Sequence, residues 1–410
     1  MARSLGLRAY RALARRTQAG AVDTGTPRPA GELLWLHCAR DADFLATVDL
    51  AAQQIALREG LSVLVTLPAP LRDGHKRAVA HHYAIHLRPL PGDHPDACTA
   101  FIDHWRPDCG IWIWGALQPN LILAADDSGV PLILLAAHEA GFEQRRDRWL
   151  PDVLRTLLPL FMTVLAASPA AVGKLTQTGL DRSQIELASA LLAGGRALPC
   201  NPDDETELTA ACVGRPVWFA NGVEAEELGT VLAAHRRALR LSHRLLLVLR
   251  PAKALPAADA MAECRQQDFR ACDWDNGEFP DESTQVLHFQ DPREIGLFYR
   301  LAPVSFLGGS LGQGTQSCDP MEAAALGSAI LYGPRVGPYL ESYTRLANEG
   351  AARIVNDSTA LGTAVTQLVA PDQAALMARA GWRVVSEGAA LFDRISDLIQ
   401  DTLDTQAGTR

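Results

Sequence analysis

The stretch VSFLGGSLGQGTQSCDPMEAAALGSAILYGP, residues 304–334, passes from a short apolar run through a glycine-rich loop into a helical pattern and ends in a second apolar run. The composition of each part predicts strands over residues 304–307 and 330–332 and a helix over residues 320–326. A strand, a crossover helix and a second strand form the unit from which parallel sheets are assembled. This stretch therefore predicts an α/β fold with a parallel sheet.

The same alternation of short apolar runs and helical stretches continues outward in both directions. Runs this rich in Val, Ile and Leu suit strands that helices cover on both faces. Residues 194–216, rich in Gly, Pro and acidic side chains, interrupt the rhythm and are typical of an interdomain linker. The sequence predicts two doubly wound, Rossmann-like domains facing a cleft, with ligands beyond the carboxyl ends of the strands. The other predicted strands lie at residues 33–37, 61–67, 109–114, 130–135, 162–166, 217–220, 245–249, 286–289 and 353–355.

Composition argues against several classes of protein. The 38 basic and 47 acidic side chains give a net charge of −9 over 410 residues, which argues against nucleic-acid binding through bulk charge. The eight cysteines are scattered without a CxxC pair, and the histidines show no metal-ligand spacing, so we assign no metal. The chain also lacks the GxxxxGK[ST] loop of P-loop NTPases.

Residues 4–16, SLGLRAYRALARR, predict a short helix with Leu5, Ala9 and Leu13 on one stripe and arginines around it. The segment is too short and too charged to span a bilayer, which takes about 20 apolar residues. Two interpretations stay open. The helix either lies on an anionic membrane surface or forms a solvated chain terminus.

The glycine-rich loop after residues 304–307 is the first candidate for chemistry. Gly309 and Ser310 lie where a backbone can approach a phosphate closely, and the helix that begins after Asp319 offers N–H groups to an anion. Glu322, in the first helical turn, is placed to accept hydrogen bonds from ribose hydroxyls. The alternative is a tight turn followed by a helix whose acidic first turn offsets its own dipole.

The segment HCARDAD, residues 37–43, follows the first predicted strand and supplies a second candidate. A carboxylate at the carboxyl end of a strand is placed to act as a general base, and Asp41 and Asp43 are both candidates. Asp43 is equally suited to cap the helix that begins at Phe44. Farther along, the charged run at residues 136–146 either holds an anionic acceptor or is a solvated loop.

The order and spacing of several blocks resemble the 3-deoxy-D-manno-octulosonic acid (Kdo) transferases, which add Kdo to a lipid A precursor. The resemblance is most specific in the GGSL segment at residues 308–311 and extends from Leu34 to about Leu398. Further matches are Pro320, Glu322, Gly333, Pro334, Trp35, His37, the Pro-Asn-Leu block at residues 119–121, Arg250 and Pro251.

The resemblance implies a GT-B fold, with two Rossmann-like domains and a C-terminal helix that crosses back to the first. It implies CMP-Kdo as the donor, a lipid A precursor as the acceptor, and inverting chemistry without a metal or other cofactor. Asp43 aligns with the family's catalytic carboxylate and is the implied general base. The implied substrate-binding residues are Gly309, Ser310, Asp319, Glu322 and, near the donor's anionic groups, Arg250.

Four segments follow from this alignment. We expect a basic amphipathic segment, a candidate membrane-surface anchor, over residues 1–20 and an acceptor domain over residues 21–205. A nucleotide-sugar domain is expected over residues 206–385 and a C-terminal helix with its tail over residues 386–410. The implied setting is lipopolysaccharide biosynthesis, as a peripheral protein at the cytoplasmic face of the bacterial inner membrane.

The sequence departs from the family's pattern at several strand ends. Asp43 stands where the family has a glutamate, which is one methylene longer, and Asp319 stands where it has an asparagine. Ala116 replaces an acid, Ala136 begins a loop that has lost its arginine, and Leu192 replaces a lysine. Two interpretations stay open. The protein is either a divergent transferase, with the same or a changed donor and acceptor, or a catalytically impaired paralogue that acts as a binding or regulatory module.

Overall fold

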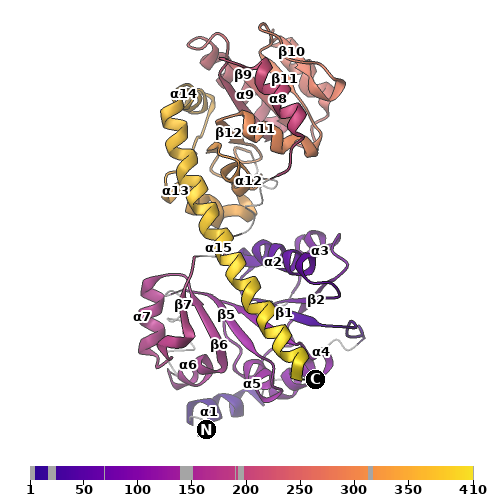
Figure 1. Ribbon diagram of the computed structural model, residues 1–410, viewed down its shortest axis with the longest axis vertical. Helices are drawn as coiled ribbons and strands as arrows, with labels where there is room; N and C mark the ends of the chain where they lie inside the picture. The colour runs from indigo at the N-terminus through magenta and orange to yellow at the C-terminus, as the bar shows by residue number, and fades with distance from the viewer. Residues whose placement is uncertain are drawn as a thin grey trace. The chain divides into compact units, whose positions relative to one another are not determined.

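The computed structural model describes residues 5–16, 25–68, 70–138, 151–189, 191–192, 198–312 and 317–409 (Figure 1). The chain divides into two compact units, of which unit 1 comprises Met1–Ala193 and Gly388–Arg410 and unit 2 comprises Gly194–Glu387. Each unit is built on one seven-stranded sheet whose neighbouring strands are parallel. The predicted fold class, two parallel α/β domains, is confirmed.

The sheet of unit 1 has the strand order β3-β2-β1-β4-β5-β6-β7. Side chains alternate between its faces, so Leu33 and Trp35 enter the core on one face while Leu34 and Leu36 enter the core on the other. The sequence analysis missed β3 and β7, which are short and less completely buried than the central strands. The strands are β1 (Leu33–Cys38), β2 (Ser62–Leu67), β3 (Ile85–Pro89), β4 (Cys109–Ile113), β5 (Leu132–Ala137), β6 (Phe161–Ala166) and β7 (Ile185–Leu187).

Helices pack on both faces of this sheet. Helices α1, α4, α5, α6 and α7 bury side chains in the core that contains Trp35, and α2 with the end of α15 buries side chains in the core that contains Leu34. This two-sided cover explains why the central strands are continuous apolar runs. The helices are α1 (Leu5–Ala14), α2 (Phe44–Leu57), α3 (Asp73–Val79), α4 (Pro95–Trp105), α5 (Pro119–Asp127), α6 (Pro151–Leu157) and α7 (Pro169–Gln177).

The sheet of unit 2 has the strand order β10-β11-β9-β8-β12-β13-β14. One face carries an aliphatic core beneath α9, α10 and α14, and the other carries an aromatic cluster in which Phe219 contacts Phe289, Phe298 and Tyr299. The strands are β8 (Val217–Val223), β9 (Leu246–Pro251), β10 (Ala271–Asp273), β11 (Val286–His288), β12 (Val304–Leu307), β13 (Ala329–Tyr332) and β14 (Ala352–Ile354). The helices are α8 (Pro202–Ala211), α9 (Ala225–Leu239), α10 (Ala257–Gln266), α11 (Ile295–Leu301), α12 (Pro320–Ala325), α13 (Leu340–Asn348) and α14 (Ser358–Leu368).

The linker predicted at residues 194–216 contains a helix, α8, which the sequence analysis did not anticipate. Asn201 caps this helix by accepting a hydrogen bond from Asp203 N, and Pro202 occupies its first position. Leu208 is fully buried and anchors the helix to unit 2. The acidic residues that suggested a solvated linker are the first turn of this helix, where they offset the helix dipole.

The last helix, α15, runs without interruption from Pro371 to Thr409 and contributes residues to both units (Figure 1). Its second half belongs to unit 1, where Gln54 Nε2 donates to Ser396 Oγ at 2.7 Å. Arg58 binds Asp404 Oδ1 at 2.8 Å and also pairs with Glu32. Five apolar side chains of this half are buried in unit 1: Leu391, Ile395, Leu398, Ile399 and Leu403.

The first described helix, α1, is docked on unit 1. Leu7 is fully buried in its core, and Tyr10 donates from its hydroxyl to Asp93 Oδ2 at 2.6 Å. Leu13, on the stripe predicted to be apolar, is 58% exposed. The alternative that this helix is a solvated terminus is therefore wrong, because Leu7 and Tyr10 attach the helix to unit 1.

Candidate functional site

The candidate donor site lies at the edge of unit 2 formed by the carboxyl ends of its parallel strands. The chain passes from β8 to β9 on one side and later returns to β12 on the other, so the strand order reverses between β8 and β12. Open α/β sheets bind ligands in the crevice at such a reversal, because the two loops that leave the strands diverge there. Residues 308–312 follow β12 and residues 224–227 follow β8.

A carboxylate of the chain itself fills the glycine-rich loop at this edge. Glu227 is buried in the first turn of α9 and accepts hydrogen bonds from the backbone N–H groups of Gly309, Ser310 and Leu311 at 2.7, 2.9 and 2.7 Å. It also accepts from Glu224 N at 3.0 Å. Gly309 and Ser310, which the sequence analysis placed around the nucleotide, therefore already bind an internal anion through their N–H groups.

The remaining parts of the loop are held by close backbone packing. The pattern Gly-x-Ser-x-Gly at residues 308–312 is that of a nucleophile elbow, but Ser310 is fully buried. Its hydroxyl donates to Leu307 O at 2.5 Å and accepts from Gly333 N at 2.8 Å. A Cβ atom on Gly308 would lie 2.5 Å from Gly222 O, so the position has no room for a side chain. Ser310 acts in this loop as a structural residue.

The two acidic residues at the start of α12 have different places. Asp319 is the N-cap of this helix, and its Oδ1 accepts from Met321 N at 2.9 Å. Pro320 occupies the first helical position, as is usual after a capping aspartate. Glu322 lies in the first turn with a half-buried side chain. The sequence analysis expected Asp319 near the donor phosphate, and in the structure its Oδ1 caps the helix.

Arg250 supplies a cation at this edge, at the carboxyl end of β9. Its Nη1 donates to Asn221 Oδ1 at 3.1 Å, and Asn221 Nδ2 donates in turn to the Tyr299 hydroxyl at 2.8 Å. Complete burial raises the pKa of Tyr299 well above its usual value, so the hydroxyl stays neutral. Arg250 Nε is buried and has no hydrogen-bond partner among the described residues. The sequence analysis missed Asn221 and Tyr299, which hold the guanidinium in place.

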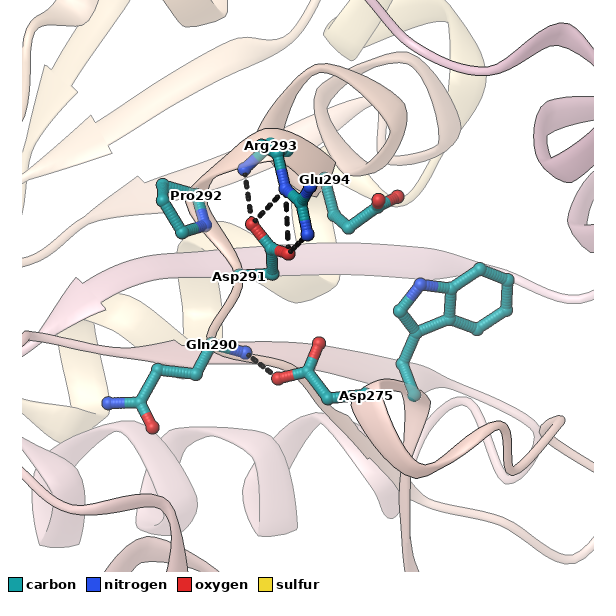
Figure 2. A pocket seen from close by; sticks show the side chains of 7 residues that line it. Asp275, Gln290, Asp291, Pro292, Arg293 and Glu294 are labelled. Atoms are coloured by element: carbon teal, nitrogen blue, oxygen red, sulfur yellow. Dashed lines mark hydrogen bonds and ion pairs between the residues drawn. The ribbon is translucent and has the colours of Figure 1, made fainter.

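A cavity of about 710 Å³ opens beside Arg250's strand, where β10 and β11 end (Figure 2). Figure 2 shows Asp291 and Arg293 paired in its wall, with Arg293 Nη2 2.5 Å from Asp291 Oδ2. Gln290 N donates to Asp275 Oδ2 at 2.7 Å. The hydrogen bonds from Arg293 lower the pKa of Asp291 to about 2. The lining residues are Trp274, Asp275, Gln290, Asp291, Pro292, Arg293 and Glu294.

In unit 1, Asp43 lies after β1, next to the point where the strand order reverses between β1 and β4. It occupies the N-cap position of α2, but its side chain makes no capping hydrogen bond. Both carboxylate oxygens instead accept from Arg40, from Nε at 2.8 Å and from Nη2 at 2.7 Å. The side chain is 2% exposed. Burial raises the pKa of Asp43, and the Arg40 guanidinium opposes that rise.

The other carboxylate of this segment, Asp41, also has partners. Its Oδ1 lies 2.6 Å from His75 Nε2, and its Oδ2 lies 2.6 Å from Arg72 Nη1. The side chain is half exposed. Asp43 is therefore the more enclosed of the two candidate bases, and Asp41 ties the segment to α3.

The two residues of β1 that carried the family resemblance, Trp35 and His37, are buried. Trp35 Nε1 donates to Thr66 Oγ1 at 2.9 Å, and His37 Nδ1 lies 3.1 Å from the same oxygen. The imidazole packs against Trp112 in a tilted arrangement, with ring centroids 4.1 Å apart. Burial lowers the pKa of His37 to about 3, so the ring is neutral near pH 7. His37 supports the strand end and takes no part in acid–base chemistry there.

The end of β5 carries a strained residue. Ala136 adopts a φ of +58°, in the left-handed region that residues with a side chain rarely enter. Such strain occurs mostly at functional sites and tight turns. The predicted anionic-acceptor run at residues 136–146 lies outside the described residues from position 139 onward. Among the residues that the structure does describe, no cluster of three His, Cys, Asp or Glu side chains is arranged to hold a metal ion.

The functional residue most clearly missed is Glu227. Its signal was present in the sequence, because Glu224 and Glu227 have the three-residue spacing of a capping box after an apolar strand. That pattern predicts a helix start. It does not predict that the carboxylate also reaches a loop more than 80 positions away along the chain.

The fold places the protein in a known class. Two parallel α/β units and a C-terminal helix shared between them are the features of the GT-B fold. The solved structure of MurG from Acinetobacter baumannii has the same fold, with a TM-score of 0.50 and 14% identity, over 90% of this chain and all of that one.

Sequence comparison shows which proteins the chain resembles. The family model for 3-deoxy-D-manno-octulosonic-acid transferase (kdotransferase) matches residues 11–191. The 3-deoxy-D-manno-octulosonic acid transferase of Bordetella pertussis is 28% identical over 396 residues, which cover 94% of this chain and 90% of that protein. The Haemophilus influenzae enzyme of the same name is 23% identical over 389 residues, which cover 92% of this chain and 88% of that protein. Over most of its length the chain is thus similar to Kdo transferases, at low identity.

Proposed function

We propose that the protein is a glycosyltransferase that transfers Kdo from CMP-Kdo to a lipid A precursor in lipopolysaccharide biosynthesis. The observation that carries this proposal is the similarity to Kdo transferases over more than nine-tenths of the chain, with few residues of either protein left over. The parallel sheets and the loops at their carboxyl edges are consistent with a nucleotide-sugar enzyme.

The donor is assigned to unit 2. Kdo is a sugar acid and CMP carries a phosphate, so CMP-Kdo brings two anionic groups to the site. The loop N–H groups are bound to Glu227, whereas Arg250 is a cation at this edge with a buried N–H still unpartnered among the described residues. We assign Arg250 to the donor's anionic groups and Glu322 to the ribose. Gly309, Ser310 and Asp319 shape the loop and the helix end around the donor.

Asp43 is assigned as the general base. In an inverting transfer, a carboxylate takes the proton of the acceptor hydroxyl. The hydroxyl oxygen attacks the anomeric carbon of Kdo at the same time, and CMP leaves. Burial makes the carboxylate of Asp43 more basic, which suits this task. Arg40 orients it through two hydrogen bonds and keeps it ionised. Aspartate in place of the family's glutamate draws the oxygens back by about an ångström, a displacement that costs up to about 100-fold unless the site compensates.

The membrane assignment concerns α1. Arg8 on this helix and Arg15 and Arg16 in the turn after it are exposed, and near anionic headgroups each contributes about 1 kcal/mol. No helix among the described residues has the length and apolar composition needed to cross a bilayer. We propose peripheral attachment to an anionic membrane surface, at the cytoplasmic face of the inner membrane. We expect the protein to float with phosphatidylglycerol vesicles. We expect this flotation to fall at least tenfold when these three arginines become glutamine.

The decisive experiment is CMP release from CMP-Kdo by the purified full chain, with and without a lipid A precursor. We expect release that depends on the acceptor and disappears in Asp43→Asn, with the Kdo-lipid product detected by mass spectrometry. The Bordetella pertussis enzyme serves as the positive control. Donor binding without turnover would overturn the transferase assignment and favour an impaired paralogue with a binding or regulatory role. Turnover of another activated sugar would instead identify a changed donor.

A further inference from the structure

A second cavity, of about 500 Å³, lies on unit 2 away from the donor edge. Its walls are the end of α9, the loop that follows α10, and Gln285, the residue immediately before β11. Because the strands of this sheet are parallel, their amino ends form the edge opposite to the glycine-rich loop. The cavity therefore belongs to neither the donor site nor the base described above.

The lining of this cavity is cationic in a protein whose net charge is −9. Arg236, Arg240 and His243 line it, and Asp268 is its single carboxylate. The chain has no acidic residue between Glu227 and Asp259, a stretch that contains five arginines and one lysine. The positive charge at the cavity is thus a property of one continuous segment.

The arginine in the wall is already held in place. Arg236 lies over the ring of Phe269, with its guanidinium carbon 4.9 Å from the ring centroid, and its Nη2 donates to Gln267 O at 2.5 Å. Phe269 is 6% exposed, so the platform beneath the guanidinium is rigid. A guanidinium fixed in this way loses little freedom when it binds an anion.

Two further side chains of the lining, Arg240 and His243, are available to a ligand. The side chains of Arg240 and His243 form no hydrogen bond or ion pair within the described part of the chain. Asp268 does not neutralise them. It adopts a φ of +60° in the turn after α10, where its N–H donates to Arg265 O at 2.9 Å, and aspartate tolerates that conformation well.

Part of this charge has a local explanation, because cations stabilise the carboxyl end of a helix such as α9. That effect is confined to the last turn of the helix. It does not account for the convergence of Arg236 and Arg240 with His243 and Gln285 on one cavity.

We propose that this cavity binds a phosphate-bearing ligand, either a soluble phosphate ester or the headgroup of an anionic lipid, at a site separate from the donor. Arg236 and Arg240 bind the phosphate oxygens, since guanidinium groups match their geometry. His243 and Gln285 line the remainder of the ligand.

The test titrates inorganic pyrophosphate into the full chain by calorimetry, with and without CMP. In parallel, the chain is floated with phosphatidylcholine vesicles that contain or lack phosphatidic acid. The variants are Arg240→Gln, the double variant Arg236→Gln with Arg240→Gln, and the control Arg265→Gln. Arg265 is an exposed arginine of α10 that does not line the cavity. A thermal melt of each variant monitors folding. Arg240→Gln leaves Arg236 in place over Phe269, so a loss of binding in this variant does not come from lost packing there.

We expect binding that weakens about tenfold in Arg240→Gln, and further in the double variant, and that stays unchanged in Arg265→Gln. Loss confined to pyrophosphate identifies a soluble phosphate ester, and loss confined to the phosphatidic acid vesicles identifies a lipid headgroup. Either result supports the site. Absence of both kinds of binding, or equal losses in Arg240→Gln and Arg265→Gln, overturns it. CMP-Kdo turnover remains intact in Arg240→Gln if the two sites are independent.

Discussion

At the scale of single residues, two buried carboxylates have different roles, one assigned to the reaction and the other to the structure of a loop. Asp43 is held by one arginine and is buried, whereas Glu227 is held by four backbone N–H groups. The first arrangement leaves an ionisable group near a strand end with a raised pKa. The second commits a carboxylate to structure, because every N–H it accepts from would otherwise be an unsatisfied donor.

Asp43→Asn is expected to lower acceptor-dependent CMP release by at least about 1,000-fold, because an amide cannot take the hydroxyl proton. Stability is expected to fall by about 1 kcal/mol, since one oxygen remains to accept from the half-exposed Arg40. Steady-state kinetics and urea unfolding measure the two effects. Asp73→Asn, at a carboxylate that is 90% exposed, is the matched control. Unchanged turnover in Asp43→Asn would remove this residue from the mechanism.

The pH dependence provides a separate test of Arg40. Because the base must be ionised, kcat/KM is expected to fall as the pH falls through the raised pKa of Asp43. Arg40→Gln removes the cation that opposes this rise, so the acid limb of the profile moves to higher pH. A pH–rate profile of both proteins measures the shift. A limb in the same place in both proteins would contradict the assigned pairing.

Glu227→Gln is expected to destabilise unit 2 by about 2 kcal/mol, because one charged acceptor becomes an amide whose NH₂ group faces N–H donors. CMP binding is expected to weaken as the loop at residues 309–311 loses its anchor. Differential scanning calorimetry and CMP titration check both effects. Glu226→Gln, at an exposed neighbour on the same helix, is expected to change neither. Equal effects of the two variants would refute the anchoring role.

At the scale of elements, α1 shows how burial selects one face of a short helix. Leu7→Ala is expected to cost about 2–4 kcal/mol, because this side chain is fully buried in the core of unit 1. Leu13→Ala, at a leucine that is 58% exposed, is expected to change stability by less than about 0.5 kcal/mol. Chemical unfolding of the two variants gives the comparison. Similar costs would mean that α1 is not docked through Leu7.

The elements also show where pattern reading succeeded. The buried central strands were predicted closely because their Val, Ile and Leu runs follow from two-sided cover by helices. β10 was missed because it spans only Ala271–Asp273, too short for any periodicity to appear. α8 was missed because its acidic first turn resembles a solvated linker until Leu208 is seen to be buried.

At the scale of the whole molecule, the last helix belongs to both units. A chain that ends at Glu387 removes the five buried apolar side chains that α15 contributes to unit 1. At about 1.5–3 kcal/mol for each, their loss matches the net stability of an ordinary domain. We expect unit 1 to unfold while unit 2 keeps its calorimetric transition and its CMP affinity. A truncated chain with both transitions intact would contradict this expectation.

The sequence by itself determined the α/β class, the two-domain plan and the resemblance to Kdo transferases, because these depend on local apolar runs and on the order of blocks along the chain. It also pointed to Asp43, since the carboxyl end of a strand is a local property. Only the tertiary structure decided what each polar group contacts. Asp43 pairs with Arg40 instead of capping α2, and Glu227 fills the loop that a phosphate was expected to occupy. The physical reason is that a buried polar group must find its partner in three dimensions, and that partner can lie anywhere along the chain.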